Sequence, residues 1–225
     1  MSDAVREHRQ SRFRAPAGAT SILLVRHGES AAAREDRPFD LVGGHGDPAL
    51  HPDGRLQAER VADRLAGEPI RAVYVTTLRR TAETAAPLAA RLGVEPQVEA
   101  DLREVYLGEW EGGVYRRHAA EGHPIARRVL TEERWDVIPG AEPAADFDAR
   151  VRAGIGRIAG RHPDQLVVAV THGGVIGSVL AQATGSRPFA FVGADNASIS
   201  LVVVAGDRWL LRVFNDTGHL AHGFA

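Results

Sequence analysis

Two apolar, strand-like runs of this chain each end in a histidine followed by a glycine. The first run is followed by Arg26-His27-Gly28, and the second by His172-Gly173. In open α/β sheets, ligands bind beyond the carboxyl ends of the strands. A neutral imidazole can act as a nucleophile near pH 7, and a guanidinium group binds phosphate or carboxylate. The pattern therefore points to chemistry on an anion.

A third block, Val75–Ala85, carries two adjacent arginines between a strand and a helix. Arg79 and Arg80 would lie at the first turn of that helix, where the helix macrodipole disfavours a cation. An anionic ligand would compensate for this cost. Two surface charges at the start of a helix are the alternative interpretation.

A fourth block, Leu102–Gly112, is rich in carboxyl groups. Glu104, Glu109 and Glu111 are its candidates for a general acid. Such an acid needs a raised pKa near neutrality, which burial or a neighbouring phosphate can supply. Without the other blocks, the segment would read as a solvated loop.

The composition excludes several other kinds of chemistry. The chain has 225 residues with 44% hydrophobic and 25% charged residues, which fits one soluble globular domain. It contains no Cys, so thiolate nucleophiles and zinc–thiolate sites are ruled out. All 27 basic residues are Arg, which removes Schiff-base chemistry and the P-loop lysine. The net charge of −2 indicates neither a nucleic acid nor a membrane partner.

Hydrophobic periodicity and turn residues predict the elements that position these blocks. Strands are expected at 21–25, 72–75, 96–99, 166–170, 198–204 and 209–214, and helices at 53–66, 79–92, 144–161 and 174–184. Residues 114–134 are expected to be helical in part, with a break at Gly122-His123-Pro124, and 34–51 and 101–113 to be loops.

This alternation predicts an α/β fold with a mostly parallel, mixed central sheet between two helical layers. The last two strands form a hairpin and would give the sheet an antiparallel edge. Residues 1–18 are Arg-rich and lack the apolar segment of a secretory signal, so we expect a disordered or loosely docked arm. Residues 19–225 are expected to form a single domain.

The segment Arg26-His27-Gly28-Glu29 resembles the signature of the histidine phosphatase superfamily, the phosphoglycerate mutase-like proteins. The other three blocks follow in the order of that family, so the resemblance runs from Ser21 to the last strand. It implies a three-layer α/β/α fold of the phosphoglycerate mutase type. Because Gly173 follows His172 where acid phosphatases and phytases have Asp, the chain resembles the branch that takes its acid from the Glu104 region.

The resemblance also implies a role for each residue. His27 would be the nucleophile that becomes phosphohistidine, and Glu104 the general acid and then the base for water. His172 would be the second histidine of the phosphate pocket, cationic when substrate is bound. Arg26 and Arg80 would bind the phosphate oxygens; Arg79 would then be a surface residue.

One pocket residue departs from the family pattern. Family members often have Asn seven residues after the signature Arg, but here that position is Ala33. Ser30 is a candidate for partial compensation, and the Gly173 backbone would contribute to phosphate binding at the start of a helix.

Several groupings imitate other sites, and we predict that none of them binds a metal. They are His45/Asp47/His51, with His51 near the position of a family Thr, and His118/Glu121/His123. Neither has a recognised ligand spacing. Asp146-Phe147-Asp148 imitates an aspartyl-phosphate motif, but lies inside a predicted helix and lacks the usual lysine partner.

The sequence thus predicts a metal-independent phosphomonoesterase that needs no cofactor and acts on a small phosphorylated metabolite through phosphohistidine. A cofactor-dependent phosphoglycerate mutase is the alternative, and a non-catalytic domain that binds a phospho-ligand is the third. Mutases resemble the signature, but their acid block contains Asn-Lys where this chain has Trp110-Glu111-Gly112. We expect a cytoplasmic protein whose partner is a small phosphate ester substrate. A homodimer is also compatible with the sequence. Specificity would reside in residues 34–51 and 115–137.

Overall fold

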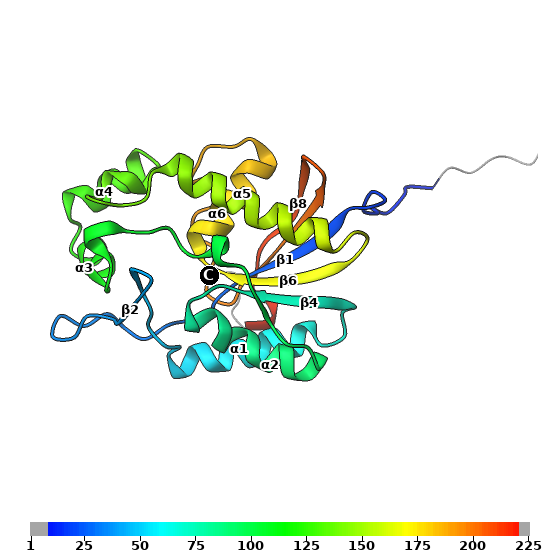
Figure 1. Ribbon diagram of the computed structural model, residues 1–225, viewed down its shortest axis with the longest axis horizontal. Helices are drawn as coiled ribbons and strands as arrows, with labels where there is room; N and C mark the ends of the chain where they lie inside the picture. Colours follow the sequence, from blue (N-terminus) through cyan, green and yellow to red (C-terminus); the bar gives the residue numbers. More distant parts are fainter. Residues whose placement is uncertain (1–8, 221–225) are drawn as a thin grey trace, which may run out of the picture.

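The computed structural model describes residues 9–220 and is built around a six-stranded sheet (Figure 1). The strand order is β5-β4-β6-β1-β7-β8. The first four of these are mutually parallel, while β7 pairs antiparallel with both β1 and β8. The strands are β1 (Thr20–Arg26), β4 (Ile70–Val75), β5 (Gln97–Val98), β6 (Leu166–Thr171), β7 (Ile199–Ala205) and β8 (Arg208–Asp216). The mixed sheet with an antiparallel edge confirms the predicted fold class.

Helices cover both faces of this sheet, with α1 and α2 below it and α5 and α6 above it in Figure 1. They are α1 (Pro52–Leu65), α2 (Arg79–Leu92), α5 (Ala144–Arg161) and α6 (Gly173–Thr184). Two shorter helices, α3 (Val114–Ala120) and α4 (Pro124–Thr131), extend beyond the carboxyl edge of the sheet. The predicted helices 79–92 and 144–161 have the observed bounds.

The strands are apolar on both faces, because helices cover both faces of the sheet. In β1, Ile22 and Leu24 pack toward α5 and α6, whereas Leu23 and Val25 pack with α1 and α2. This alternation follows from the two-residue period of a strand. Both layers therefore fix β1, and with it the position of the loop that begins after Arg26.

Two segments show structure that the periodicity did not resolve. Within the loop predicted at 34–51, a small antiparallel hairpin pairs β2 (Leu41–Val42) with β3 (His45–Gly46). The predicted break at 122–124 separates α3 from α4. Gly122 has φ +66°, the side chain of His123 caps α4, and Pro124 occupies its first turn. These three features stop one helix and start the next.

Residues 9–18 are exposed and form no helix or strand, and the Phe13 ring lies 3.7 Å from the guanidinium carbon of Arg212. The predicted arm 1–18 extends beyond the described residues, so the division into an arm and one domain stays a prediction. Within 9–220, no helix is long and apolar enough to cross a membrane.

Candidate active site

The two His-Gly strand ends lie side by side at the carboxyl edge of the sheet. Arg26, the last residue of β1, is in register with Thr171 of β6, and the His27 amide donates to the Thr171 carbonyl at 2.9 Å. The rings of His27 and His172 are 5.2 Å apart, centre to centre, at 64°. Parallel pairing of β1 and β6 thus joins two blocks separated by more than half of the chain.

Hydrogen bonds determine which nitrogen of His27 carries the proton. Nδ1 lies 2.7 Å from the carbonyl oxygen of Gly28, which can only accept, so Nδ1 is protonated. Nε2 lies 3.2 Å from Nε of Arg80, which can only donate, so Nε2 carries the lone pair. His27 is therefore held as the tautomer whose Nε2 can act as a nucleophile.

The hydrogen bonds of His27 require its neutral form, and burial favours the neutral form of His172. The pKa of His27 is lowered far below its ordinary value, first by burial and then by the positive charges of Arg80 and Arg26. Burial also lowers the pKa of His172 strongly, with Arg80 as the next cause. A bound phosphate dianion would oppose both effects, which agrees with the expectation that His172 is cationic only with substrate bound.

Arg80 and Arg26 place two guanidinium groups beside His27. Arg80 is buried in the first turn of α2, donates to the carbonyl oxygen of Gly46 at 2.9 Å, and has its pKa lowered to about 10, chiefly by burial. Arg26 donates to the carbonyl of Ala194, and its buried Nε has no partner among the described residues. Unused donors on both side chains remain for an anion.

His172 is fully buried at the start of α6. Its Nε2 lies 3.1 Å from the Thr76 hydroxyl, whereas Nδ1 has no hydrogen-bond partner within the part of the chain that the structure describes. Gly173 opens α6, and a side-chain carbon at that position would approach the Arg26 guanidinium. An unpaired imidazole nitrogen and the amides of a helix N-terminus are both suited to phosphate oxygens.

Two acidic residues of the fourth block, Glu104 and Glu111, line a cavity with Arg26, His27 and Arg80. Glu104 lies next to the start of α6. Its two carboxylate oxygens accept from the amides of Val105 at 3.0 Å and Gly174 at 3.2 Å. In Glu111, both oxygens accept from backbone amides, those of Gly46 at 2.7 Å and Leu107 at 2.9 Å. Glu109 is exposed on the molecular surface. Exposure disfavours Glu109, whereas the choice of Glu104 over Glu111 as the reacting acid stays a prediction.

Arg150 of α5 holds the segment that carries Glu104, and no sequence motif pointed to this role. Its guanidinium donates to the carbonyls of Asp101 and Arg103 at 2.7 Å and of Glu104 at 2.9 Å. It also forms an ion pair of 2.7 Å with Glu142, and each side chain is only 16% exposed. The pair acts as a clamp on this loop.

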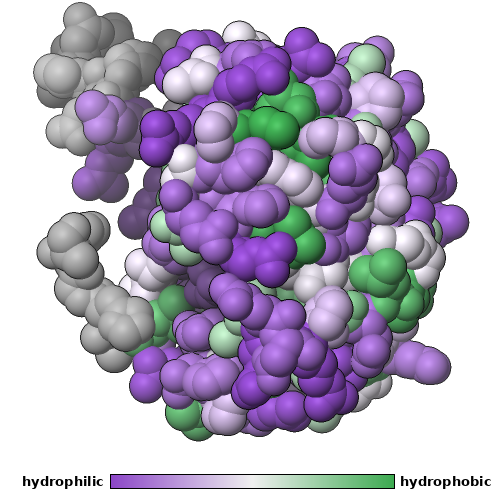
Figure 2. Space-filling model, turned by 90° about the vertical axis from the view of Figure 1, so that its left-hand side faces the viewer, coloured by the Kyte–Doolittle hydropathy of each residue, from purple (hydrophilic) through white to green (hydrophobic). Residues whose placement is uncertain are grey.

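Two adjoining cavities of about 550 Å³ and 270 Å³ open onto His27 and share Arg26, Gly113 and Arg116. Asn196, which the sequence analysis missed, lines the larger one and donates to the His27 carbonyl at 2.9 Å. Both cavities lie at the carboxyl end of the parallel strands, the end that faces the viewer in Figure 2, where most of the surface is hydrophilic.

The structure gives Ser30 a definite partner. Its buried hydroxyl oxygen accepts from Nη2 of Arg116 at 2.7 Å. Ala33 lines the same cavity and contributes no donor to it. Phosphate binding by Ser30 stays a prediction, and Arg116 adds the donors that Ala33 lacks on this side of the cavity.

Gly28 is required by close backbone packing, which leads to a prediction about stability. A side-chain carbon at this position would lie 2.4 Å from the Gly54 carbonyl oxygen in α1. We expect Gly28→Ala to lower the free energy of unfolding by roughly 1–3 kcal/mol in urea titrations, because one backbone must move. The control Gly156→Ala places a methyl group in open space on α5 and should be neutral or stabilising. Equal effects of the two variants would contradict this assignment.

Two of the groupings that imitate other sites have structural explanations. His118 and His123 pack together with the Trp110 ring, at 4.6 Å and 5.2 Å from it between ring centres. Asp146 and Asp148 lie within α5, as expected. That the site contains no metal stays a prediction.

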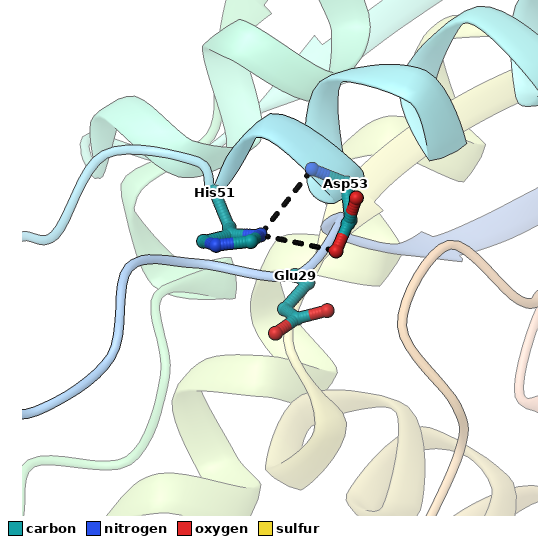
Figure 3. A group of neighbouring side chains, drawn as sticks. All are labelled: Glu29, His51 and Asp53. Atoms are coloured by element: carbon teal, nitrogen blue, oxygen red, sulfur yellow. Dashed lines mark hydrogen bonds and ion pairs between the residues drawn. The ribbon is translucent and has the colours of Figure 1, made fainter.

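One other grouping among the described residues has the spacing of a metal site: Glu29, His51 and Asp53 (Figure 3). The two carboxylates are exposed, and Nδ1 of His51 accepts from the Asp53 amide at 3.3 Å as the cap of α1. Helix capping accounts for this arrangement.

Comparison with known proteins agrees with the fold. The profile of the histidine phosphatase superfamily (branch 1) matches residues 22–217. Phosphoglycerate mutase-like protein 4 of Arabidopsis thaliana is 38% identical over 207 residues, covering 88% of this chain and 86% of its own length. The metal-independent phosphoserine phosphatase of the same plant is 31% identical over 225 residues, covering 97% and 91%.

Comparison with solved structures also shows this fold. A mycobacterial glucosyl-3-phosphoglycerate phosphatase superposes with a TM-score of 0.71 at 27% identity, over 88% of this chain and 100% of that one. A phosphoglycerate mutase from Bacillus anthracis shares the fold, with a TM-score of 0.75 at 21% identity over 91% of this chain and 96% of that one. The chain with its paired His-Gly strand ends therefore belongs to branch 1 of the histidine phosphatase superfamily.

Proposed function

We propose that this chain is a metal-independent phosphomonoesterase that acts on a small phosphorylated metabolite through a phosphohistidine intermediate. The observation that carries the proposal is the state of His27. It is a buried, neutral imidazole whose Nε2 lone pair faces a guanidinium group. The positive charge that holds a phosphoryl group would come from arginine.

In the bound state, the phosphoryl group would lie between His27 and its surrounding donors. Arg26 and Arg80 would bind its oxygens, together with Nδ1 of His172 and the amide of Gly173. The hydrogen bond from Arg80 to His27 Nε2 would pass to phosphate, which frees the lone pair. Phosphoryl transfer depends mainly on such positioning and charge stabilisation.

The reaction would then proceed in two displacements. Nε2 of His27 attacks phosphorus, the bond from phosphorus to the ester oxygen breaks, and protonated Glu104 gives its proton to the leaving alcohol. The Glu104 carboxylate next takes a proton from water, the hydroxide oxygen bonds to phosphorus, and the bond from phosphorus to His27 breaks. Inorganic phosphate leaves, and both side chains return to their starting states.

The relatives support hydrolysis of small phosphoesters, since two of them are named phosphoserine phosphatase and glucosyl-3-phosphoglycerate phosphatase. The mutase alternative differs only in returning phosphate to a bound acceptor, so an assay with bisphosphoglycerate separates the two. A non-catalytic domain is disfavoured, because His27, Arg26, Arg80 and Glu104 all line one cavity. A cytoplasmic location and a homodimer stay predictions.

The test of this function is release of phosphate from p-nitrophenyl phosphate and from a panel of phosphorylated metabolites, with and without EDTA. We expect turnover that EDTA leaves intact. Strong inhibition by EDTA that a divalent ion reverses would contradict a mechanism based on arginine and histidine alone.

The role of Glu104 leads to a second test, in which the leaving group is varied. Glu104→Gln should lower kcat/KM for glycerol 3-phosphate by about 10²–10⁴-fold and affect p-nitrophenyl phosphate much less, since only the poor leaving group needs a proton. We compare kcat/KM because it reports phosphoryl transfer to His27. Glu109→Gln is the matched control. Equal slowing of both esters in Glu104→Gln would mean that the acid lies elsewhere.

A further inference from the structure

Arg116 is a further guanidinium group at the catalytic cavity, and the mechanism above does not use it. Arg34 and Arg117 also line the larger cavity, but Arg116 lines the smaller one with Arg80 as well. It lies on α3 and lines both cavities together with Arg26 and His27. Its Nη1 donates to the Ala31 carbonyl at 2.9 Å and its Nη2 to the Ser30 hydroxyl at 2.7 Å.

The side chain of Arg116 is held in place before any ligand binds. Besides these two hydrogen bonds, its guanidinium carbon lies 5.3 Å from the centre of the Phe39 ring. A guanidinium group has five N–H donors, and the two hydrogen bonds leave three of them free. Arg116 thus presents a positioned charge with unused donors, as a binding residue requires.

Arg116 forms no ion pair with a described residue, although Glu29 lines the same cavity. Among residues 9–220, Arg26, Arg80 and Arg116 have no carboxylate oxygen within 4.0 Å, whereas many other arginines of the described chain form ion pairs. Ser30 and Ala31 supply neutral oxygens only. Arg116 is exposed at the mouth of the cavity. Partial desolvation and the positive charge of Arg26 lower its pKa, and Glu29 opposes this.

The position of Arg116 indicates what it binds. Arg26 and Arg80 lie beside His27 and would bind the phosphoryl oxygens. Arg116 is instead anchored through Ser30 and Ala31 at the larger cavity. A carboxylate elsewhere on the substrate would complement it, since a planar carboxylate suits a guanidinium fork.

We propose that Arg116 binds a substrate carboxylate, so that this enzyme selects phosphomonoesters of small carboxylic acids. The cavity of about 550 Å³ that Arg116 lines with His27 can hold a molecule of that size. The inference rests on the proposed function and adds to it the class of substrate. Ser30 and Phe39 act as positioning residues for Arg116.

Two matched substrate pairs test this proposal. O-phosphoserine and phosphoethanolamine differ by one carboxylate, and so do 3-phosphoglycerate and glycerol 3-phosphate, in which the carboxylate becomes a hydroxymethyl group. We expect the acid of at least one pair to have a kcat/KM about 10–100-fold higher, since a charge-assisted interaction has that magnitude. Arg116→Met should reduce this ratio to near one, and Arg116→Lys should restore part of it.

Arg71→Met is the matched control, since Arg71 is an exposed residue of β4 outside both cavities, and it should keep the ratio. A ratio near one for both pairs in the parent enzyme, or a ratio that Arg116→Met leaves in place, would overturn the proposal. So would a preference for fructose 1,6-bisphosphate over fructose 6-phosphate that exceeds the preference for either acid, since this outcome would identify a second phosphate.

Binding measurements separate this inference from the proposed function. In the His27→Ala background, calorimetry gives the Kd of each compound without turnover. A preference for the acid that disappears with Arg116→Met supports the anion site even if the chain hydrolyses nothing. Turnover of p-nitrophenyl phosphate without any such preference would sustain the phosphatase and refute the carboxylate site.

Discussion

Replacing His27 with Ala should reduce kcat for p-nitrophenyl phosphate by at least about 10⁴-fold, the largest effect that we expect from any single substitution. Nε2 of His27 is the atom that would receive the phosphoryl group, and no neighbouring side chain can take over. His172 lies 5.2 Å away between ring centres, but its Nε2 faces the Thr76 hydroxyl, and its Nδ1 would donate to a phosphate oxygen and so carry a proton. Steady-state hydrolysis of p-nitrophenyl phosphate measures the loss.

The matched control is His162→Gln, at the opposite end of the sheet. His162 forms hydrogen bonds of 2.9 Å with the Tyr74 hydroxyl and with Gln165, far from the strand ends that carry the site. This variant should retain the parent rate once thermal melting shows that it is folded. Substantial hydrolysis by folded His27→Ala would show that another group is the nucleophile.

Arg80→Met should lower kcat/KM by about 10²–10³-fold, the cost of losing one preorganised donor to a charged transition state. The Arg80 side chain is buried and contacts the nucleophile directly. It also ties the hairpin of β2 and β3 to the site through the Gly46 carbonyl, at 2.9 Å. Methionine fills similar space without the charge, so the variant separates electrostatic from packing effects.

The neighbouring Arg79 provides the control on the same helix turn. Its side chain is half exposed, and its nearest acidic group is Asp47, at 3.9 Å. Arg79→Met should change kcat/KM by no more than about twofold. A larger loss in Arg79→Met than in Arg80→Met would reverse the assignment of the phosphate-binding arginine that the motif spacing predicted.

Much of the fold was predictable because local sequence signals coincide with the tertiary arrangement. The apolar runs around Leu23 and Val168 are buried on both faces, which is the arrangement that continuous hydrophobic strands indicate. Gly93 ends α2 in the left-handed conformation, as its position suggested. The positions of the signature residues were predictable for the same reason, since Arg26 ends a strand and His27 and His172 immediately follow one. Their roles stay predictions.

Other site residues could not be predicted, because tertiary packing alone brings them to the cavity. Arg116, Arg150 and Asn196 stand on helices or loops without a recognisable motif. Arg150 reaches the Glu104 segment from 46 residues away, and Asn196 reaches His27 from 169 residues away. The small hairpin Leu41–Gly46 was missed because each of its strands has only two residues, too few for a period to appear.

The direct test of the central claim is rapid acid or alkali quenching during turnover of a ³²P-labelled phosphoester, followed by peptide mapping. The account predicts a phosphoryl group on the peptide that contains His27, stable in alkali and lost in acid, which appears and decays at rates consistent with kcat. Turnover without any such adduct, or an adduct on another residue, would contradict it.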